Sequence, residues 1–298
     1  MQELILGTVQ LGLPYGINNK QGKPSHEEAF KILEYAYNNG VRMLDTASGY
    51  GESEKIIGEY IKQEKNEFGI TTKLSKLEYN EDIKAFVNKQ IDNSLNLLGK
   101  ECIEIYLLHN FEDLKKTNGL MDELVRLKYE NKIKKIGVSL YEPSELEYIL
   151  LNYSDEMDVV QIPFNLFDYR WLENDLLKRT EEKSVQIFVR SVFLQGLFFL
   201  EDEMQMNAID HSLKDYLIAI KQIAREMNIS IEQLALSYVK SFSEIKGILV
   251  GCENVNQLKG NIQLFRSNIT IRDTDKRKIF KLTQGISSKI IDPRQWNR

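Results

Sequence analysis

Short apolar runs alternate with longer amphipathic segments along almost the whole chain, and this alternation limits the possible folds more than any other feature. The apolar runs have the length and composition of β-strands and lie at residues 4–8, 43–45, 70–73, 103–109, 136–139, 159–163, 186–191 and 248–251. The segments between them carry apolar residues at helical spacing and lie at residues 26–39, 53–64, 80–98, 117–130, 143–152, 171–182, 212–227, 230–241 and 254–265. Repeated strand–helix units predict a parallel sheet covered by helices, which is either doubly wound or closed into a barrel.

Eight such units favour the closed (β/α)8 fold, the TIM barrel, over the doubly wound sheet. The chain has 298 residues, which is close to the typical barrel length of about 250 residues plus insertions. The stretch GTVQLG at 7–12 lacks the GxGxxG spacing of a doubly wound dinucleotide-binding fold. No linker, repeat or low-complexity segment divides the chain. We therefore predict a single catalytic barrel domain over residues 1–298, with an extra C-terminal helix at 272–284 and a polar insertion at 200–211 as a candidate flap.

Several helix ends carry recognisable signals. Ser25 stands where an N-cap is expected, with Glu28 three residues later, which is the arrangement of a capping box. Gly40 follows Asn39 at the end of the same helix, where glycine is common. Pro143 suits the first turn of a later helix, because its missing N–H has no partner to lose there.

Composition and charge argue against several classes of partner. The formal net charge is -5 and the pI is about 5.5, so neither a nucleic acid nor an anionic membrane is expected as a partner. No stretch approaches the about 20 apolar residues of a membrane span, and the first residues lack the pattern of a secretory signal. Cys102 and Cys252 are far apart without a CxxC motif, which favours buried thiols over a disulfide framework. We expect a cytoplasmic protein without a metal site.

Ionisable residues stand at the ends of three successive predicted strands. Asp45 ends the second strand, Lys73 the third and His109 the fourth, and Tyr50 follows Asp45 in a glycine-flanked loop. In a parallel barrel the carboxyl ends of all strands face one mouth, so these side chains are expected to meet there. Tyrosine is a weak acid on its own, but a nearby ammonium stabilises the phenolate, and a carboxylate can hold that ammonium in place. The set therefore predicts proton donation by Tyr50, with Asp45 and Lys73 supporting it and a neutral His109 orienting the substrate oxygen.

In sequence, this set resembles the Asp–Tyr–Lys–His tetrad of the aldo-keto reductase superfamily. The segments LDTASGYGESE, YLLHN, LGTVQLG and GVSL carry the resemblance, which extends over residues 6–264. It implies a barrel that binds a nicotinamide dinucleotide in extended form across its mouth. It also implies hydride transfer from nicotinamide C4 to a carbonyl carbon, with the tyrosine protonating the oxygen.

The same resemblance implies a set of coenzyme contacts. Ser139 and Gln161 match the residues that hold the nicotinamide carboxamide, although Leu140 stands where many members have asparagine. Arg190 stands where a tyrosine usually stacks on the nicotinamide, and an ion pair with a carboxylate at the mouth is the alternative role for it. The other expected contacts come from the first strand, the pyrophosphate loop and the adenosine segment, and are Thr8, Ser191, Leu194, Gly196, Gly251, Glu253, Gln257 and Asn261.

The segment GILVGCENVNQLKGNI at 247–262, at and after the last strand, resembles the one that contacts the adenosine in the family, and it bears on the choice of coenzyme. Members that select NADP(H) usually place Arg or Lys there to pair with the 2′-phosphate. In this chain Glu253 occupies the segment and the first cation is Lys259. Glu253 suits a ribose 2′-hydroxyl, as acidic residues do in NAD sites, or it is simply a carboxylate at a helix N-terminus. The resemblance favours NADP(H) by a narrow margin, and NAD(H) remains the alternative.

The sequence therefore predicts an NAD(P)H-dependent reductase of aldehydes or ketones, with a sugar-like carbonyl compound as one candidate substrate. Two alternatives stay open. One is a lyase in which Lys73 forms a Schiff base with the substrate, and the other is a regulatory barrel that binds the nucleotide with little turnover. The tail at 291–298 is a candidate to fold back over the mouth with Arg294 or Trp296.

Overall fold

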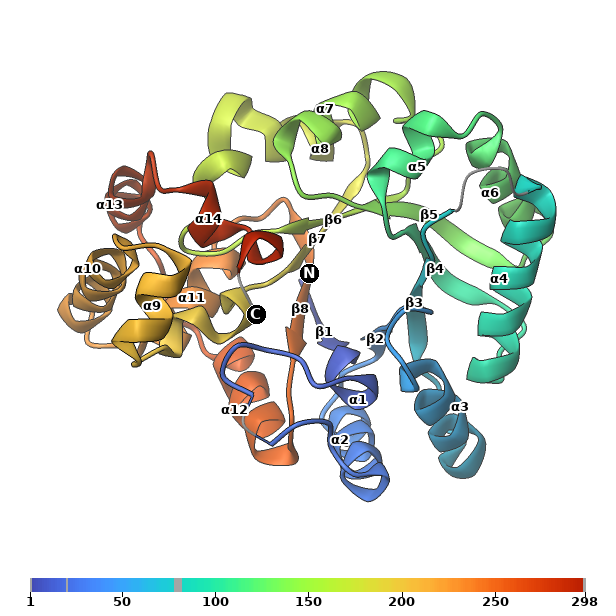
Figure 1. Cartoon of the computed structure of the whole chain (residues 1–298), viewed down its shortest axis with the longest axis horizontal. Coiled ribbons are helices and arrows are strands. Elements are labelled where there is room, and N and C mark those ends of the chain that lie inside the picture. Colours follow the sequence, from blue (N-terminus) through green and yellow to red (C-terminus); the bar gives the residue numbers. More distant parts are fainter. Residues whose placement is uncertain (1, 20, 78–81, 297–298) are drawn as a thin grey trace.

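Eight parallel strands form a closed barrel in chain order, as the sequence predicts (Figure 1). The computed structural model describes residues 2–19, 21–77 and 82–296. The strands are β1 (Glu3–Gly7), β2 (Met43–Asp45), β3 (Gly69–Leu74), β4 (Ile103–Leu108), β5 (Ile133–Ser139), β6 (Val159–Pro163), β7 (Gln186–Arg190) and β8 (Ile245–Gly251). β1 pairs with both β2 and β8, which closes the sheet on itself.

Helices surround the barrel, as Figure 1 shows. The long ones are α2 (His26–Asn38), α3 (Ser53–Glu64), α4 (Ile83–Leu98), α6 (Leu120–Tyr129), α7 (Pro143–Asn152), α10 (Leu213–Glu226), α11 (Ile231–Lys240), α12 (Val255–Arg266) and α13 (Asp273–Thr283). The short ones are α1 (Val9–Gly12), α5 (Phe111–Lys116), α8 (Leu176–Glu182), α9 (Glu203–Ile209), α14 (Ser288–Ile291), η1 (Tyr169–Asp175), η2 (Leu194–Phe199) and η3 (Pro293–Gln295). The expected helices are present except at 171–182, where Glu173 and Asn174 have non-helical backbone angles and divide the segment into η1 and α8. Positions 80 and 81 of the segment predicted at 80–98 lie outside the described residues.

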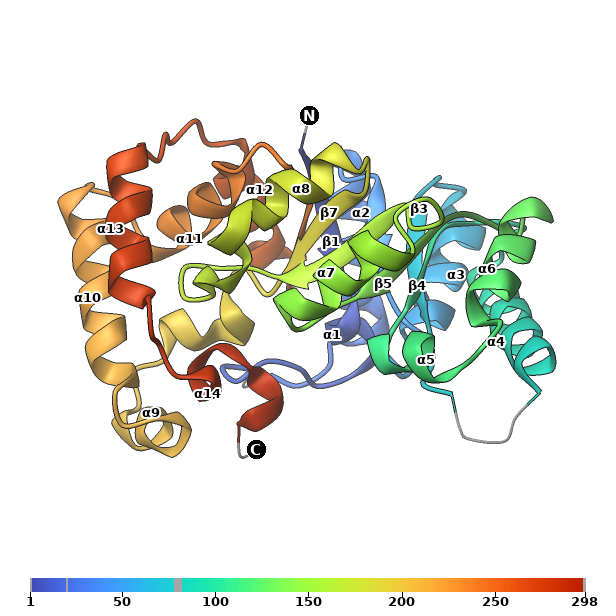
Figure 2. The same ribbon diagram turned by 90° about the horizontal axis from the view of Figure 1, so that it is seen from above.

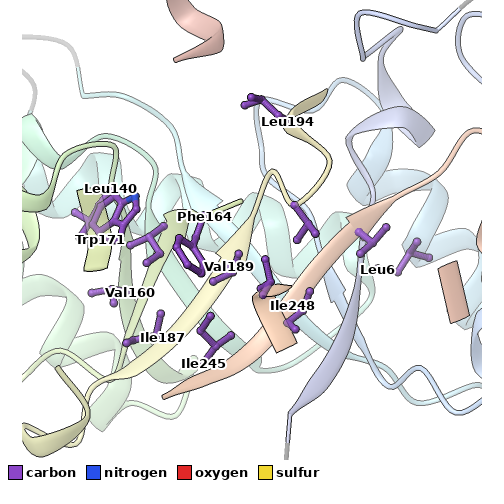
Figure 3. Close-up of a cluster of buried hydrophobic side chains, with 14 of the residues drawn as sticks. Leu6, Leu140, Val160, Phe164, Trp171, Ile187, Val189, Leu194, Ile245 and Ile248 are labelled. Atoms are coloured by element: carbon purple, nitrogen blue, oxygen red, sulfur yellow. The ribbon is translucent and has the colours of Figure 1, made fainter. Parts of the chain in front are cut away.

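The core has two parts because strand residues alternate between the two faces of the sheet. Side chains from β1, β4, β6, β7 and β8 meet inside the barrel, and they are Ile5, Ile105, Leu107, Val159, Phe188 and Leu249. The residues between them, such as Leu6 and Val160, point outward into a larger cluster under the helices (Figure 3). The filled interior makes the barrel a packed core rather than a pore, so a ligand is restricted to its ends.

Local signals fix the helix ends, with one correction. Ser25 accepts a hydrogen bond from the Glu28 N–H and so caps α2. The prediction of a full capping box is wrong, however. The Glu28 carboxylate does not accept from the Ser25 N–H but from the Val255 N–H, at 3.1 Å. Glu28 therefore joins the start of α12 to α2, a contact that residue spacing along α2 cannot reveal. Pro143 opens α7, as expected.

The insertion and the tail both lie at the carboxyl ends of the strands. The segment predicted as a polar flap contains the short helix α9, whose Met206 is buried. The predicted extra helix is α13, and α14 and η3 follow it on the same side of the barrel as α5 and α9 (Figure 2). The Trp296 indole N–H donates to the Lys289 carbonyl at 2.7 Å, which folds the tail on itself. Among the described residues, no helix has the length and apolar character needed to cross a bilayer.

Candidate active site

The four residues of the predicted tetrad come from neighbouring elements at one end of the barrel. Asp45 ends β2, Lys73 is the fifth residue of β3, and His109 follows β4. The Lys73 ammonium lies 2.5 Å from a carboxylate oxygen of Asp45, and their side chains are only 1% and 6% exposed. The ammonium lies 4.9 Å from the centre of the Tyr50 ring. The contacts thus join a buried ion pair to a tyrosine.

The surroundings of Lys73 keep it charged. Burial lowers the pKa of Lys73, but the charges and hydrogen bonds of Asp45 and Tyr50 together raise it more, so the pKa lies above its ordinary value. The ammonium also donates to the Thr46 carbonyl at 2.9 Å. Because a buried charge is costly unless it is paired and hydrogen-bonded, this arrangement is what a permanent ammonium in the barrel mouth requires.

His109 lies against Tyr50 as a neutral imidazole. The two rings are nearly perpendicular, with their centres 5.9 Å apart. Burial, followed by the charges of Lys73 and Arg190, lowers the pKa of His109 to about 4. At neutral pH the ring therefore has one N–H to donate and one nitrogen to accept.

Gln161 is linked to the tetrad, which the sequence did not predict. Its amide nitrogen donates to the second carboxylate oxygen of Asp45 at 2.7 Å, and the side chain is fully buried. Both oxygens of Asp45 are thus engaged, one by Lys73 and one by Gln161. The Gln161 amide oxygen is buried without a hydrogen-bond partner among the described residues. It is an acceptor that a ligand amide can satisfy, which fits the carboxamide contact expected for Gln161.

A cavity of about 430 Å³ begins at Asp45 and Tyr50 and extends to the start of α12. Most of the expected coenzyme residues line it, namely Thr8, Gln161, Arg190, Ser191, Gly196, Gly251, Glu253, Gln257 and Asn261. Ser139 and Leu194 are buried and do not line it. The Leu194 side chain belongs to the core cluster, as Figure 3 shows.

The loop after β7 has an unusual backbone. Ser191, Leu194 and Gln195 all have positive φ, at 62°, 46° and 53°. Such conformations cost about 1–3 kcal/mol each and collect at ligand sites, where surrounding contacts impose them. They turn the loop beside the cavity, where backbone N–H groups are suited to a diphosphate.

A second loop, at 12–24 after β1, reaches across to the first. The Asn18 amide donates to the Gly196 carbonyl at 2.6 Å, and the Ile17 N–H donates to the Gln195 carbonyl at 3.1 Å. Further residues line the cavity that the sequence did not single out, including Gln10, Asn18, Phe193 and Phe199. The length of the loop at 12–24 was the one feature of the sequence that could have indicated its part in the cavity.

Arg190 has no carboxylate partner in the described part of the chain, so the alternative of an ion pair at the mouth is not found. Its guanidinium donates to the Leu140 carbonyl at 3.0 Å and lies 4.2 Å from the centre of the Tyr141 ring. Arg294 lies 3.7 Å from the same ring, so the tail does fold back to the mouth. It forms an ion pair with Asp292 at 2.8 Å.

The far end of the cavity is built on α12. Asn254 caps this helix by accepting from the Gln257 N–H at 2.9 Å. The Glu253 N–H donates to the Gln257 side chain at 2.8 Å, and the Asn261 amide donates to the Gly251 carbonyl at 3.3 Å. Both cysteines are free thiols; Cys252 is buried, as expected, whereas Cys102 is partly exposed. Within residues 2–19, 21–77 and 82–296, no three His, Cys, Asp or Glu side chains are grouped to hold a metal.

Comparisons with known proteins agree with this geometry. A model of the aldo/keto reductase family matches residues 3–280. An NADH-specific methylglyoxal reductase from Escherichia coli is 26% identical, with 86% of this chain and 87% of that protein covered. A D-arabinose 1-dehydrogenase from Saccharomyces cerevisiae is also 26% identical, over 80% of this chain and 77% of that protein.

Solved structures share the fold. An aldo-keto reductase from Bacillus halodurans superposes with a TM-score of 0.77 at 20% identity, covering 98% of this chain and 94% of the other. A glycerol dehydrogenase from Gluconobacter oxydans gives 0.73 at 21% identity, with 94% and 90% covered. The family match over nearly the whole chain confirms both the predicted resemblance and the barrel. The chain belongs to the aldo/keto reductase family, whose members are oxidoreductases that use NAD(P)H to reduce carbonyl groups.

Proposed function

We propose that this chain reduces an aldehyde or ketone at the Asp45 end of its cavity, with Tyr50 as the general acid. The observation that carries the proposal is the buried pair of Lys73 and Asp45 beside Tyr50, at the opening of a cavity that suits a dinucleotide. When bound, the reduced nicotinamide supplies the hydride that adds to the carbonyl carbon. The residues of the chain supply the proton and the orientation.

Proton transfer runs from the Tyr50 hydroxyl to the carbonyl oxygen as negative charge develops there. The Lys73 ammonium stabilises the phenolate that remains, because it is charged and lies against the ring. Asp45 holds the ammonium in position, and Gln161 holds Asp45. The arrangement acts as one unit, so the loss of any member is expected to reduce proton transfer.

His109 orients the substrate. As a neutral imidazole it donates one hydrogen bond to the carbonyl oxygen, which fixes the carbonyl between His109 and Tyr50. Because its pKa is about 4, the ring is not an imidazolium at neutral pH and does not compete with Tyr50 as the acid.

Coenzyme binding is assigned to the residues that line the rest of the cavity. The free amide oxygen of Gln161 fits the nicotinamide carboxamide, with Ser139 beside it in the sheet. Thr8 and the loop of Ser191, Leu194 and Gly196 fit the diphosphate, and the adenosine falls to Gly251, Glu253, Gln257 and Asn261. These assignments rest on the resemblance of the residues to those that bind the coenzyme in the family.

The charges at the adenosine end favour NAD(H). Glu253 lines the cavity there, and a carboxylate repels a 2′-phosphate but accepts from a 2′-hydroxyl. A relative of this chain is named an NADH-specific methylglyoxal reductase, which supports the same choice. The expectation of NADP(H) came from the family resemblance and stays a prediction. Small carbonyl compounds as partners, a cytoplasmic location and one catalytic domain over the whole chain also remain predictions.

The two alternatives have less support. A Schiff base needs a neutral amine, whereas Lys73 is buried, paired with Asp45 and held in its charged form. A regulatory barrel without turnover has no need of a complete tetrad, and all four members are present here.

The proposal is tested with stereospecifically deuterated NADH and NADPH against a panel of aldehydes, ketones and nucleotide-linked keto-sugars. We expect coenzyme oxidation with at least one carbonyl compound, and deuterium on the carbinol carbon of the product. Coenzyme binding without oxidation across the panel would favour the regulatory barrel. A borohydride-trapped adduct on Lys73 would favour the lyase.

A further inference from the structure

A chain of three buried hydroxyls joins the two ends of the loop that carries Tyr50. Thr8 follows β1, Thr46 follows β2 and Ser53 opens α3, and all three residues are fully buried. The Thr46 hydroxyl donates to the Ser53 oxygen at 3.0 Å, and the Ser53 hydroxyl donates to Thr8, whose hydroxyl and carbonyl oxygens lie 2.9 and 3.0 Å away. The Thr8 hydroxyl donates to the Asp45 carbonyl at 2.8 Å. Each hydroxyl has one proton to give, so Ser53 is the member that joins the other two.

The loop between Thr46 and Ser53 is rich in glycine. Glycine stands on both sides of Tyr50, and Gly51 has a φ of 56°. Because glycine allows the backbone many conformations, the position of Tyr50 depends on how the ends of the loop are held. Ser53 holds the loop twice, since its hydroxyl accepts from Thr46 and its N–H donates to the Tyr50 carbonyl at 3.1 Å. The loop also packs closely on Gly12 of α1, where a Cβ atom would lie 1.7 Å from the Tyr50 carbonyl oxygen.

The same hydroxyls also hold the backbone around the ion pair. The Thr46 carbonyl accepts from the Lys73 ammonium at 2.9 Å, and Thr8 is bonded to the carbonyl of Asp45. One chain of hydrogen bonds therefore sets both the loop that carries Tyr50 and the backbone from which the Asp45 carboxylate and a further acceptor reach Lys73.

We propose that Ser53 is a positioning residue for the reduction. Its hydroxyl joins the loop of Tyr50 to Thr46 and Thr8, and so fixes the Tyr50 hydroxyl relative to the Lys73 ammonium and the carbonyl compound. The inference rests on the proposed function, in which Tyr50 gives the proton. Ser53 is fully buried and does not line the cavity, so it acts through the geometry of Tyr50. Catalysis is sensitive to such geometry, because a displacement of about 1 Å can cost about 100-fold in rate.

Four variants test the inference. Ser53→Ala removes the central hydroxyl. Thr46→Val removes the hydroxyl that donates to Ser53 and keeps the shape of the side chain, whereas Thr46→Ser keeps the hydroxyl and removes a methyl group. The control is Ser94→Ala on α4, because the Ser94 hydroxyl is also buried but has no hydrogen-bond partner among the described residues. For each variant we measure the dissociation constants of NADH and NADPH, and the kcat, KM and pH profile of kcat with a carbonyl compound that the wild-type protein reduces.

We expect Ser53→Ala to lower kcat about tenfold, less than the loss of the general acid itself, and to leave KM and the coenzyme dissociation constants within about threefold of wild type. The alkaline limb of the pH profile should move to higher pH, because Tyr50 is held less closely to the ammonium that stabilises its phenolate. Thr46→Val should show the same two changes, and Thr46→Ser should retain more of kcat than Thr46→Val. Ser94→Ala should match the wild type.

Two results would overturn the inference. One is a Ser53→Ala variant whose kcat and pH profile match those of Ser94→Ala. The other is a kcat that falls while the alkaline limb stays in place, because the hydroxyl then supports the fold and not Tyr50. Should Ser53→Ala fail to fold and bind coenzyme, the Thr46 pair decides, and equal kcat values in Thr46→Val and Thr46→Ser would contradict the inference. Turnover by the wild-type protein leaves the proposed function standing in each case, whereas a wild-type protein that binds coenzyme and reduces no carbonyl compound contradicts both.

Discussion

At the level of single residues, the charge on Lys73 decides how readily Tyr50 releases its proton. The ammonium is buried, paired with Asp45 and close to the tyrosine ring. Lys73→Met removes the charge but keeps much of the volume, so we expect kcat to fall about 100-fold or more, the usual contribution of general acid catalysis. Steady-state kinetics with Lys62→Met, an exposed lysine on α3, serve as the control. Coenzyme binding by the Lys73 variant verifies that it is folded, and activity within tenfold of wild type would contradict the role.

His109 gives a prediction about pH. Because its pKa in the folded state is about 4, below the ordinary value of about 6.5, the unfolded chain binds more protons between these values. The contribution of His109 to stability is therefore complete above about pH 6.5 and is lost as the pH falls toward 4. Imidazole NMR should show a ring that is still neutral at pH 5, and its signal should vanish in His109→Gln. A His109 signal that titrates near 6.5 would contradict the buried, neutral ring.

Single residues also show which contacts could be predicted from the sequence and which could not. The tetrad was predictable because its members stand at or next to strand ends, and strand ends can be read from local patterns. The bond of Gln161 to Asp45 joins residues 116 positions apart and depends on how the barrel closes. The pairing of Glu28 with the start of α12 is hidden for the same reason.

At the level of elements, the turn from β8 into α12 governs the choice between coenzymes. Glu253 lines the cavity at this turn. Glu253→Arg replaces a repelling carboxylate with a phosphate-binding guanidinium, so the ratio of kcat/KM for NADPH over NADH should rise about tenfold or more. Glu244→Arg, before the opposite end of β8, is the matched control. An unchanged ratio in the Glu253 variant would mean that this turn does not meet the 2′-phosphate position.

The elements that the sequence did not predict are short and irregular. α5 and α9 have six and seven residues, too few for a clear helical period, and each is stabilised by burying side chains such as Phe111 and Met206. The loop after β7 has three non-glycine residues at positive φ, which local propensity opposes. Tertiary contacts, such as those of Ile17 and Asn18 with Gln195 and Gly196, impose this loop shape.

At the level of the whole molecule, the repeated strand–helix units predict the fold, and the fold determines where the site lies. Eight strand–helix units close into one barrel, and parallel strands direct their carboxyl ends to one mouth. The tetrad could therefore be placed without coordinates. The segments that lie over the mouth could not be placed in this way, because the tail and the loop at 12–24 reach it through contacts with residues remote in sequence.

The central claim is that Tyr50 donates the proton, and Tyr50→Phe tests it most directly. The substitution removes one hydroxyl and keeps the ring that lies against His109 and Lys73. With a carbonyl compound that the wild-type protein reduces, we predict a kcat lowered about 100-fold or more, and a coenzyme dissociation constant within about threefold of wild type, less than the tenfold change that about 1.4 kcal/mol produces. A variant that keeps more than a tenth of the wild-type kcat would show that another group gives the proton.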